Sequence, residues 1–222
     1  MDKILNNKGD GKVLVLGGMI SAGKSTATKI LSDYFGSEAF YEPVDESENP
    51  ILAKFYEDKS RYSFELQMLF LGRRFKMIKQ ALTEKNNVLD RSIYEDQLFA
   101  RINYENGDME KYQYEMYCDI ANEMMKEIAG MPKKAPDLMI YLEVPFETIL
   151  ERIKMRGREC ELNPDDITYY RQLWEEYKNW FEEYDASPKL KIKNYGEHDL
   201  STEKGKQHLI HEVEKALQEN NI

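Results

Sequence analysis

A glycine-rich octapeptide, placed between a short apolar run and an amphipathic segment, defines the fold class of this chain. The apolar run Val-Leu-Val-Leu at 13–16 is typical of a strand that is buried on both faces of a sheet. Apolar residues behind the octapeptide recur at the spacing of one helix face; they are Ala27, Ile30, Leu31, Tyr34 and Phe35. A strand that passes through a tight glycine turn into a helix is typical of α/β domains with parallel sheets.

The same alternation of strand and helix patterns continues to the end of the chain. Short apolar runs predict further strands at 39–42, 88–90, 138–142 and 190–192. Apolar spacing predicts helices at 64–82, 93–106, 110–129, 146–155, 163–184 and 203–219. We therefore expect an α/β fold whose five-stranded parallel sheet is flanked by helices on both faces. Because no repeat or linker divides the 222 residues, we expect a single domain, 1–222.

Composition disfavours several classes of partner. The chain has 31 Lys and Arg against 41 Asp and Glu, a formal net charge of −10, whereas a duplex-binding protein usually carries a basic face. Neither a membrane helix nor a signal peptide is indicated, because no apolar run is long enough. Cys118 and Cys160 provide no disulfide framework. We therefore expect a cytoplasmic protein that binds neither nucleic acid nor membrane.

The octapeptide fits the phosphate-loop pattern G-x-x-x-x-G-K-[ST] at every fixed position. In this pattern backbone amides surround phosphate oxygens, and the N-terminus of the following helix adds partial positive charge. Lys24 is expected to reach the β- and γ-phosphates, and Ser25 to bind Mg²⁺. The expected triphosphate-binding residues of the loop are Gly18, Met19, Ile20, Ser21, Ala22, Gly23, Lys24, Ser25 and Thr26. This motif indicates a nucleoside triphosphate but not a reaction.

Three uses of a triphosphate compete: a small-molecule kinase, a GTP-dependent switch, and an ATPase that acts on a macromolecule. A switch protein should carry D-x-x-G after a strand and N/T-K-x-D for guanine. Asp90 is followed by Arg91-Ser92-Ile93, and the Asn7-Lys8 pair precedes the phosphate loop. A nucleic-acid motor would carry more positive charge and usually a longer chain. The sequence therefore favours the kinase.

Two further features suit phosphoryl transfer. Arg152 and Arg156 are spaced i,i+4 on a predicted helix, and Arg158 follows after Gly157. Like charges at this spacing repel, but a triphosphate would stabilise them, and Gly157 would allow the segment to close as a lid. A solvated basic helix end explains the same spacing equally well. Glu42, at the end of the second predicted strand, could accept a proton from an attacking hydroxyl.

Together these motifs resemble the deoxyribonucleoside kinases, in particular the bacterial deoxyadenosine/deoxyguanosine and deoxyadenosine/deoxycytidine kinases. The resemblance extends from the phosphate loop to about Leu190, and its elements follow in family order: GMISAGKST, YEPVDESENPIL, FYEDKSRYSFELQMLFLGRRF, LDRSIYED, YLEV and RIKMRGRECEL. It implies a P-loop kinase fold with an arginine-rich lid at about 156–163. It also implies transfer of the γ-phosphate of ATP to the 5′-hydroxyl of a deoxyribonucleoside, with deoxyadenosine favoured over deoxycytidine or deoxyguanosine.

The resemblance implies roles for individual residues as well. Glu42 matches the catalytic base, Arg91 matches the group that steadies Glu42 and the 5′-oxygen, and Asp90 matches a Mg²⁺ ligand beside Ser25. Lys24 completes the catalytic set. The matches to the phosphate-binding arginines of the lid are Arg152, Arg156 and Arg158. The matches to the nucleoside site are Glu42, Tyr56, Gln67, Arg74, Arg91, Asp96 and Glu161.

Within the nucleoside site, Tyr56 and Glu161 correspond to the pair that binds the sugar 3′-hydroxyl. Gln67, Arg74 and Asp96 correspond to the residues that read the base. Family habit further implies a homodimer, which the helices at 64–82 and 110–129 could form.

Thymidylate-type monophosphate kinases are the closest alternative, because they share the phosphate loop and often an Asp-Arg motif. They typically carry an arginine before the Glu-Pro pair, where it binds the phosphate of the acceptor. That position is Tyr41 here, which favours an uncharged acceptor. A different phosphate clamp would still be compatible with the sequence.

Overall fold

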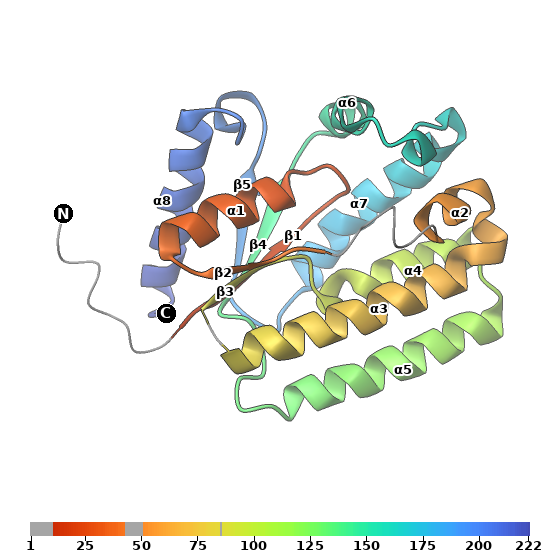
Figure 1. Ribbon diagram of the computed structural model, residues 1–222, viewed down its shortest axis with the longest axis horizontal. Coiled ribbons are helices and arrows are strands. Elements are labelled where there is room, and N and C mark those ends of the chain that lie inside the picture. The colour runs from red at the N-terminus through yellow and green to blue at the C-terminus, as the bar shows by residue number, and fades with distance from the viewer. Residues whose placement is uncertain (1–10, 43–50, 85) are drawn as a thin grey trace.

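The computed structural model of the chain describes residues 11–42, 51–84 and 86–222 (Figure 1). In these residues a five-stranded parallel sheet has the strand order β2-β3-β1-β4-β5. The strands are β1 (Val13–Gly17), β2 (Glu38–Phe40), β3 (Asn87–Asp90), β4 (Leu138–Glu143) and β5 (Lys189–Lys193). The expected fold class is therefore confirmed. Because β1 lies between β3 and β4, the strand order reverses at β1, where parallel sheets usually bind ligands.

Helices cover both faces of the sheet (Figure 1). Leu14 and Leu16 of β1 belong to the core beneath α1 (Lys24–Phe35) and α8 (Glu203–Glu219). Val13 and Val15 belong to the core beneath α3 (Lys59–Glu84) and α5 (Lys111–Ala129). Since successive strand residues point to opposite faces, a strand covered on both sides must be apolar throughout.

Four more helices complete the described part of the fold. They are α2 (Ile51–Glu57), α4 (Asp96–Glu105), α6 (Phe146–Arg156) and α7 (Ile167–Glu183). Two of the predicted helices, those at 93–106 and 163–184, begin later than expected, because a 3₁₀ turn precedes each of them. The side chain of Asn163 accepts a hydrogen bond from the amide of Asp165 at 3.1 Å and so caps the 3₁₀ turn that precedes α7. Helix α2 was not predicted, since seven residues are too few for a clear apolar period.

The second strand is shorter than the predicted 39–42. It pairs only with β3, through Glu38, Ala39 and Phe40, and it ends there. Glu42 therefore lies beyond the strand, where the chain leaves the sheet edge toward the arginines described below.

Helix α7 carries the aromatic side chains that fill the core next to β4. Tyr170, Tyr177 and Phe181 are buried, and the ring of Phe181 stacks on Tyr141 with a centroid distance of 4.9 Å. None of the helices in the described part of the chain has the length and apolar character that a membrane span requires.

Candidate active site

A cavity of about 510 Å³ lies where the chain leaves the carboxyl ends of the parallel strands. Most of the predicted site residues line it: Ile20, Ser21, Gly23, Lys24, Ser25, Thr26, Glu42, Tyr56, Gln67, Arg74, Asp90, Arg91, Arg152, Arg156, Arg158 and Glu161. The predicted residues outside this lining are Gly18, Met19, Ala22 and Asp96. The side chains of Met19 and Ala22 are buried in the core, so only their backbone is available to a phosphate.

The phosphate loop rests on the segment that follows β5. The side-chain amide of Asn194 donates a hydrogen bond to the carbonyl of Ala22 at 2.7 Å. Gly23 has φ +93°, and a Cβ there would lie 2.5 Å from the Asn194 amide nitrogen. Only glycine adopts this φ readily and also leaves room for the Asn194 side chain, which explains the second fixed glycine of the motif. Asn194 itself was missed by the sequence analysis, because a single asparagine after a strand carries no distinctive signal.

Lys24, the first residue of α1, spans the phosphate loop. Its ammonium donates to the carbonyls of Gly18 and Met19 at 2.9 and 2.8 Å. Burial and, to a lesser degree, the neighbouring Arg91 lower the pKa of Lys24 to about 7, against the opposing effect of the carboxylates of Asp90 and Glu95. A bound polyphosphate would place negative charge next to Lys24 and so stabilise the protonated form of its buried side chain.

Ser25 and Asp90 lie side by side at the mouth of the loop. The Ser25 hydroxyl donates a hydrogen bond to the Asp90 carboxylate. A hydroxyl and a carboxylate are hard oxygen donors, and Mg²⁺ in nucleotide sites takes one or two such protein ligands and completes its shell with phosphate and water. The pair therefore fits a Mg²⁺ ion that accompanies a triphosphate.

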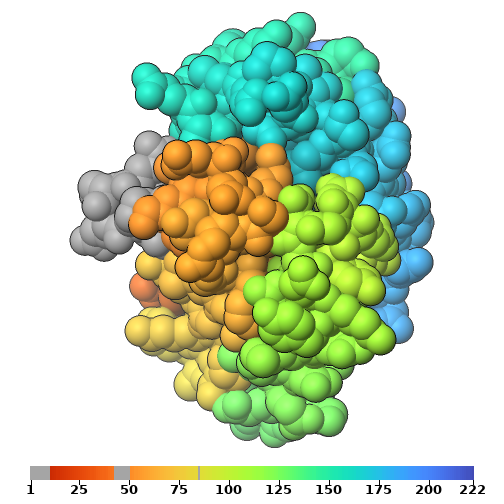
Figure 2. All heavy atoms as spheres, turned by 90° about the vertical axis from the view of Figure 1, so that its right-hand side faces the viewer, coloured from red at the N-terminus to blue at the C-terminus, as the bar shows by residue number. Residues whose placement is uncertain are grey.

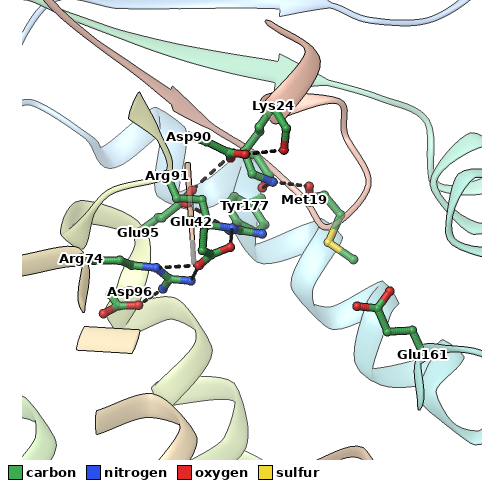
Figure 3. A network of polar contacts seen from close by, with 12 residues as sticks. Met19, Lys24, Glu42, Arg74, Asp90, Arg91, Glu95, Asp96, Glu161 and Tyr177 are labelled. Atoms are coloured by element: carbon green, nitrogen blue, oxygen red, sulfur yellow. Dashed lines mark hydrogen bonds and ion pairs between the residues drawn. The ribbon is translucent and has the colours of Figure 1, made fainter. Parts of the chain in front are cut away.

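Glu42 lies between two guanidinium groups (Figure 3). Arg74 donates to it through Nε at 2.9 Å and through a second nitrogen, and Arg91 Nε lies 3.0 Å from its other oxygen. Burial alone would raise the pKa of this carboxyl, but the charges of Arg74 and Arg91 outweigh burial and lower the pKa to about 2. Glu42 is therefore a carboxylate at neutral pH, within reach of the cavity.

Gln67, Arg74 and Asp96 come together on the side of the cavity formed by α3 and α4. Arg74 forms an ion pair with Asp96 behind the cavity wall, and Phe70 and Phe99 lie against the Arg74 guanidinium. Gln67 Oε1 and Asp96 Oδ2 are buried without a hydrogen-bond partner among the described residues. A buried acceptor of this kind requires a donor, and a heterocyclic base that enters the cavity can provide one to Gln67, which lines it.

Tyr56 of α2 and Glu161 lie near each other in the lining of the cavity. Glu161 forms ion pairs with Arg156 and, at 3.4 Å, with Arg158, and its side chain stands apart from the Glu42 cluster (Figure 3). In the space-filling view, α2 (orange) and the segment after α6 (teal) lie against each other (Figure 2). Helix α2 and the segment after α6 therefore line neighbouring parts of the cavity.

The three predicted lid arginines fall into two groups. Arg156 and Arg158 bind Glu161, whereas Arg152 binds the Asp199 carboxylate and the Asn194 carbonyl, both at 2.8 Å. Arg152 thus lies beside the phosphate loop. Its partner Asp199 was missed by the sequence analysis, because the segment between β5 and α8 matches no motif that we used.

The family model for deoxynucleoside kinase matches residues 14–218. The chain belongs to the deoxynucleoside kinase family. It is 44% identical to a deoxyguanosine kinase of Lactobacillus johnsonii, over 93% of both chains, and 40% identical to a deoxyadenosine kinase of Lactobacillus acidophilus, over 94% of this chain and 97% of the relative. A solved structure of deoxyadenosine kinase from M. mycoides with bound dATP is similar with a TM-score of 0.76 at 30% identity, over 91% of this chain and 99% of the other.

As a deoxynucleoside kinase, the protein is a phosphotransferase that uses a nucleoside triphosphate. The family match decides against the GTP-dependent switch and the ATPase that acts on a macromolecule. It also favours a nucleoside over a nucleoside monophosphate as acceptor, in agreement with the tyrosine at position 41.

Proposed function

We propose that this kinase transfers the γ-phosphoryl group of ATP to the 5′-hydroxyl of a deoxyribonucleoside, with deoxyadenosine as the preferred acceptor. The observation that carries the proposal is the ionised Glu42 carboxylate, held by two arginines in the same cavity as the phosphate loop. A hydroxyl bound at Glu42 can pass its proton to that carboxylate while its oxygen faces the γ-phosphate.

The chemical step divides among the residues of the cavity. Lys24, Arg152 and the amides of the phosphate loop bind the phosphates and stabilise the charge that develops on the transferred group. Arg91 keeps Glu42 in place and attracts the 5′-oxygen as it loses its proton. Ser25 and Asp90 would hold Mg²⁺, which neutralises phosphate charge when it is bound. Arg156 and Arg158, in the proposed lid at 156–163, would exclude water from the reaction.

Recognition of the nucleoside would use the opposite walls of the cavity. Tyr56 and Glu161 would bind the sugar 3′-hydroxyl, and the crowding of Tyr56 against the sugar disfavours a ribose 2′-hydroxyl. Gln67 can exchange a donor and an acceptor with the N6/N7 edge of adenine. Its oxygen, which lacks a hydrogen-bond partner among the described residues, would favour a base that carries an amino group.

Deoxyguanosine is the second candidate. The 44% identity to a deoxyguanosine kinase favours it, and guanine also offers N–H donors to the unsatisfied oxygen of Gln67. Deoxycytidine, with one amino group, can satisfy the same residue. The acceptor test is therefore a panel of the four deoxynucleosides, the four ribonucleosides and the deoxynucleoside monophosphates, each with ATP and Mg²⁺.

Turnover with deoxyadenosine at the highest kcat/KM supports the proposal in full, whereas a higher value for deoxyguanosine keeps the reaction but changes the base. Turnover with monophosphates alone would overturn it. Lys24→Ala serves as the control, since loss of the phosphate-loop cation should abolish ATP-dependent transfer to every acceptor.

We also propose that the kinase forms a homodimer through α3 and α5. Phe64, Met68 and Phe75 on α3 are only half-buried, and Tyr112 and Met116 on α5 are exposed. A second copy that packs these helices against its own would remove this apolar surface from water. Sedimentation analysis should show a dimer that Met116→Glu weakens, and a monomeric wild type would overturn the proposal.

A further inference from the structure

Glu95 is a buried carboxylate that the mechanism above does not use. Its side chain is 1% exposed, and it ends the 3₁₀ turn Ile93–Glu95 that precedes α4. A buried carboxylate is costly unless charges or hydrogen bonds compensate it, so its partners show what it holds together.

The two oxygens of Glu95 bind two different parts of the site. Oε1 accepts a hydrogen bond from Arg91 Nη1 at 2.9 Å. Oε2 accepts a hydrogen bond from the backbone amide of Gly18, the first residue of the phosphate loop, at 3.3 Å. One carboxylate thus connects the arginine that holds Glu42 with the loop that would hold the donor phosphates.

Arg91 requires such support because its backbone is strained. It has φ +74°, in the left-handed region that residues with a side chain rarely adopt, and its amide donates to the Leu16 carbonyl at 3.0 Å. Its guanidinium is held by Glu42, Glu95 and the hydroxyl of Tyr177. With Phe99 beneath it, the group is fixed from several directions.

We infer that Glu95 is a positioning residue for phosphoryl transfer: it fixes Arg91, and through it Glu42, at a set distance from the phosphate loop. Tyr177 supports the same guanidinium from α7. This inference rests on the proposed role of Glu42. A misplacement of about 1 Å can lower the rate on the order of 10²-fold. A fixed distance between Glu42 and the phosphate loop should therefore raise kcat.

The test compares Glu95→Gln and Glu95→Asp with the wild type. Glutamine keeps the shape of the side chain but removes the negative charge that faces Arg91. Aspartate keeps the negative charge but is too short to reach both Arg91 and the amide of Gly18. Both variants should lower kcat by roughly 10- to 100-fold, while KM for ATP and for the deoxynucleoside stays within about threefold. A merely structural role would instead lower the amount of folded protein without this division between kcat and KM.

Asp137→Asn is the matched control. Asp137 accepts from the amide of Val13 and from Lys133, so it also joins β1 to a cation, but at the opposite end of the strand. This variant should reduce stability without a selective fall in kcat.

Tyr177→Phe is the second test and applies even where the Glu95 variants do not fold. Loss of its hydroxyl should lower kcat about 3- to 10-fold with unchanged KM, and its effect should combine with that of Glu95→Gln less than multiplicatively, because both act on one guanidinium. Wild-type kcat in folded Glu95→Gln, or in Tyr177→Phe where Glu95→Gln does not fold, would overturn the inference. A wild type that phosphorylates no deoxynucleoside would instead overturn the proposed function.

Discussion

Glu42 shows how strongly the surroundings of one side chain determine its chemistry. Placed between Arg74 and Arg91, it keeps a negative charge in a largely buried position that would raise the pKa of a lone carboxyl. The loss of that charge should affect both catalysis and stability, and the two effects can be measured separately.

The first prediction concerns turnover. Glu42→Gln should lower kcat by about 10² or more, the usual effect of losing a general base, and leave deoxynucleoside binding largely intact. The measurement is steady-state kinetics with the best acceptor, together with nucleoside binding by calorimetry. Glu38→Gln, an exposed carboxylate at the start of β2, is the control. A kcat within a few-fold of wild type would show that Glu42 is not the base.

The second prediction concerns acid stability. The folded pKa of Glu42, about 2, lies below its ordinary value of 4.5, so the unfolded chain binds the proton more tightly. The stabilisation from the carboxylate is therefore fully present above pH 4.5 and is lost as the pH falls through about 2. Urea unfolding of wild type and Glu42→Gln should show a difference of roughly 3 kcal/mol at neutral pH that narrows below pH 4.5. A difference that does not change with pH would contradict the assigned charge state.

At this scale, the sequence predicted residues that belong to motifs and missed those that only support them. Lys24 and Ser25 follow from spacing alone, and Glu42, Arg74 and Asp96 from resemblance. Glu95 is four residues after Arg91, a common spacing for an ion pair, but no pattern indicates that its second oxygen meets the amide of Gly18. That contact joins residues 77 positions apart, and such distances are fixed only by the fold.

Among the elements, α3 has two functions along one helix. Leu71 and Ile78 pack into the core, while Gln67 and Arg74, two turns apart, face the cavity. The periodicity of the sequence predicted the helix, and the polar residues within its apolar pattern marked the wall of a pocket.

The third prediction tests this wall. Gln67→Leu should raise KM for the deoxynucleoside by on the order of 10-fold or more, because a base that has lost its partner is left with unpaired polar groups. KM for ATP should stay within about twofold. Glu65→Gln, exposed on the same helix, is the control. Equal increases for both substrates would exclude a base-reading role.

Element boundaries were less predictable than the elements themselves. The first strand, β4, α5 and α8 differ from their predicted ranges by at most a residue or so, because each has a long or continuous apolar pattern. Strand β2 ends two residues early, since an edge strand has one partner and its end is set by where that pairing stops. Helix α2 is too short to show a period, and its position depends on contacts with distant segments.

At the scale of the whole molecule, the net charge of the chain is negative, whereas basic side chains gather in its cavity. The chain has a formal net charge of −10, yet its cavity is lined by Lys24 and by five arginines, at positions 74, 91, 152, 156 and 158. The fold causes this concentration, because α1, α3, α6 and the segment after β3 all line the cavity at the carboxyl ends of the parallel strands. An acidic protein thus presents a positive cavity to an anionic substrate.

The fourth prediction follows from that cavity. ATP with Mg²⁺ at 100 times its Kd should stabilise the folded state by about 2.7 kcal/mol, which corresponds to a rise in Tm of roughly 5–11 °C for a chain of this size. Differential scanning fluorimetry gives the shift directly. Lys24→Ala should remove most of it, and an equal shift in that variant would place the triphosphate elsewhere.

The indole N–H of Trp180, in α7, donates a hydrogen bond to the carbonyl of Tyr94 at 2.8 Å. The Trp180 ring lies so close to Gly17 that a Cβ added to this glycine would be 3.2 Å from the ring. The chain contains only one other tryptophan, Trp174, whose indole donates to the carbonyl of Val144. Both fluorophores therefore sit on one helix, and one of them touches the residue before the phosphate loop. With Trp174→Phe as background, we expect the emission of Trp180 to change when a triphosphate occupies the loop, so that binding can be followed on the millisecond scale without a label.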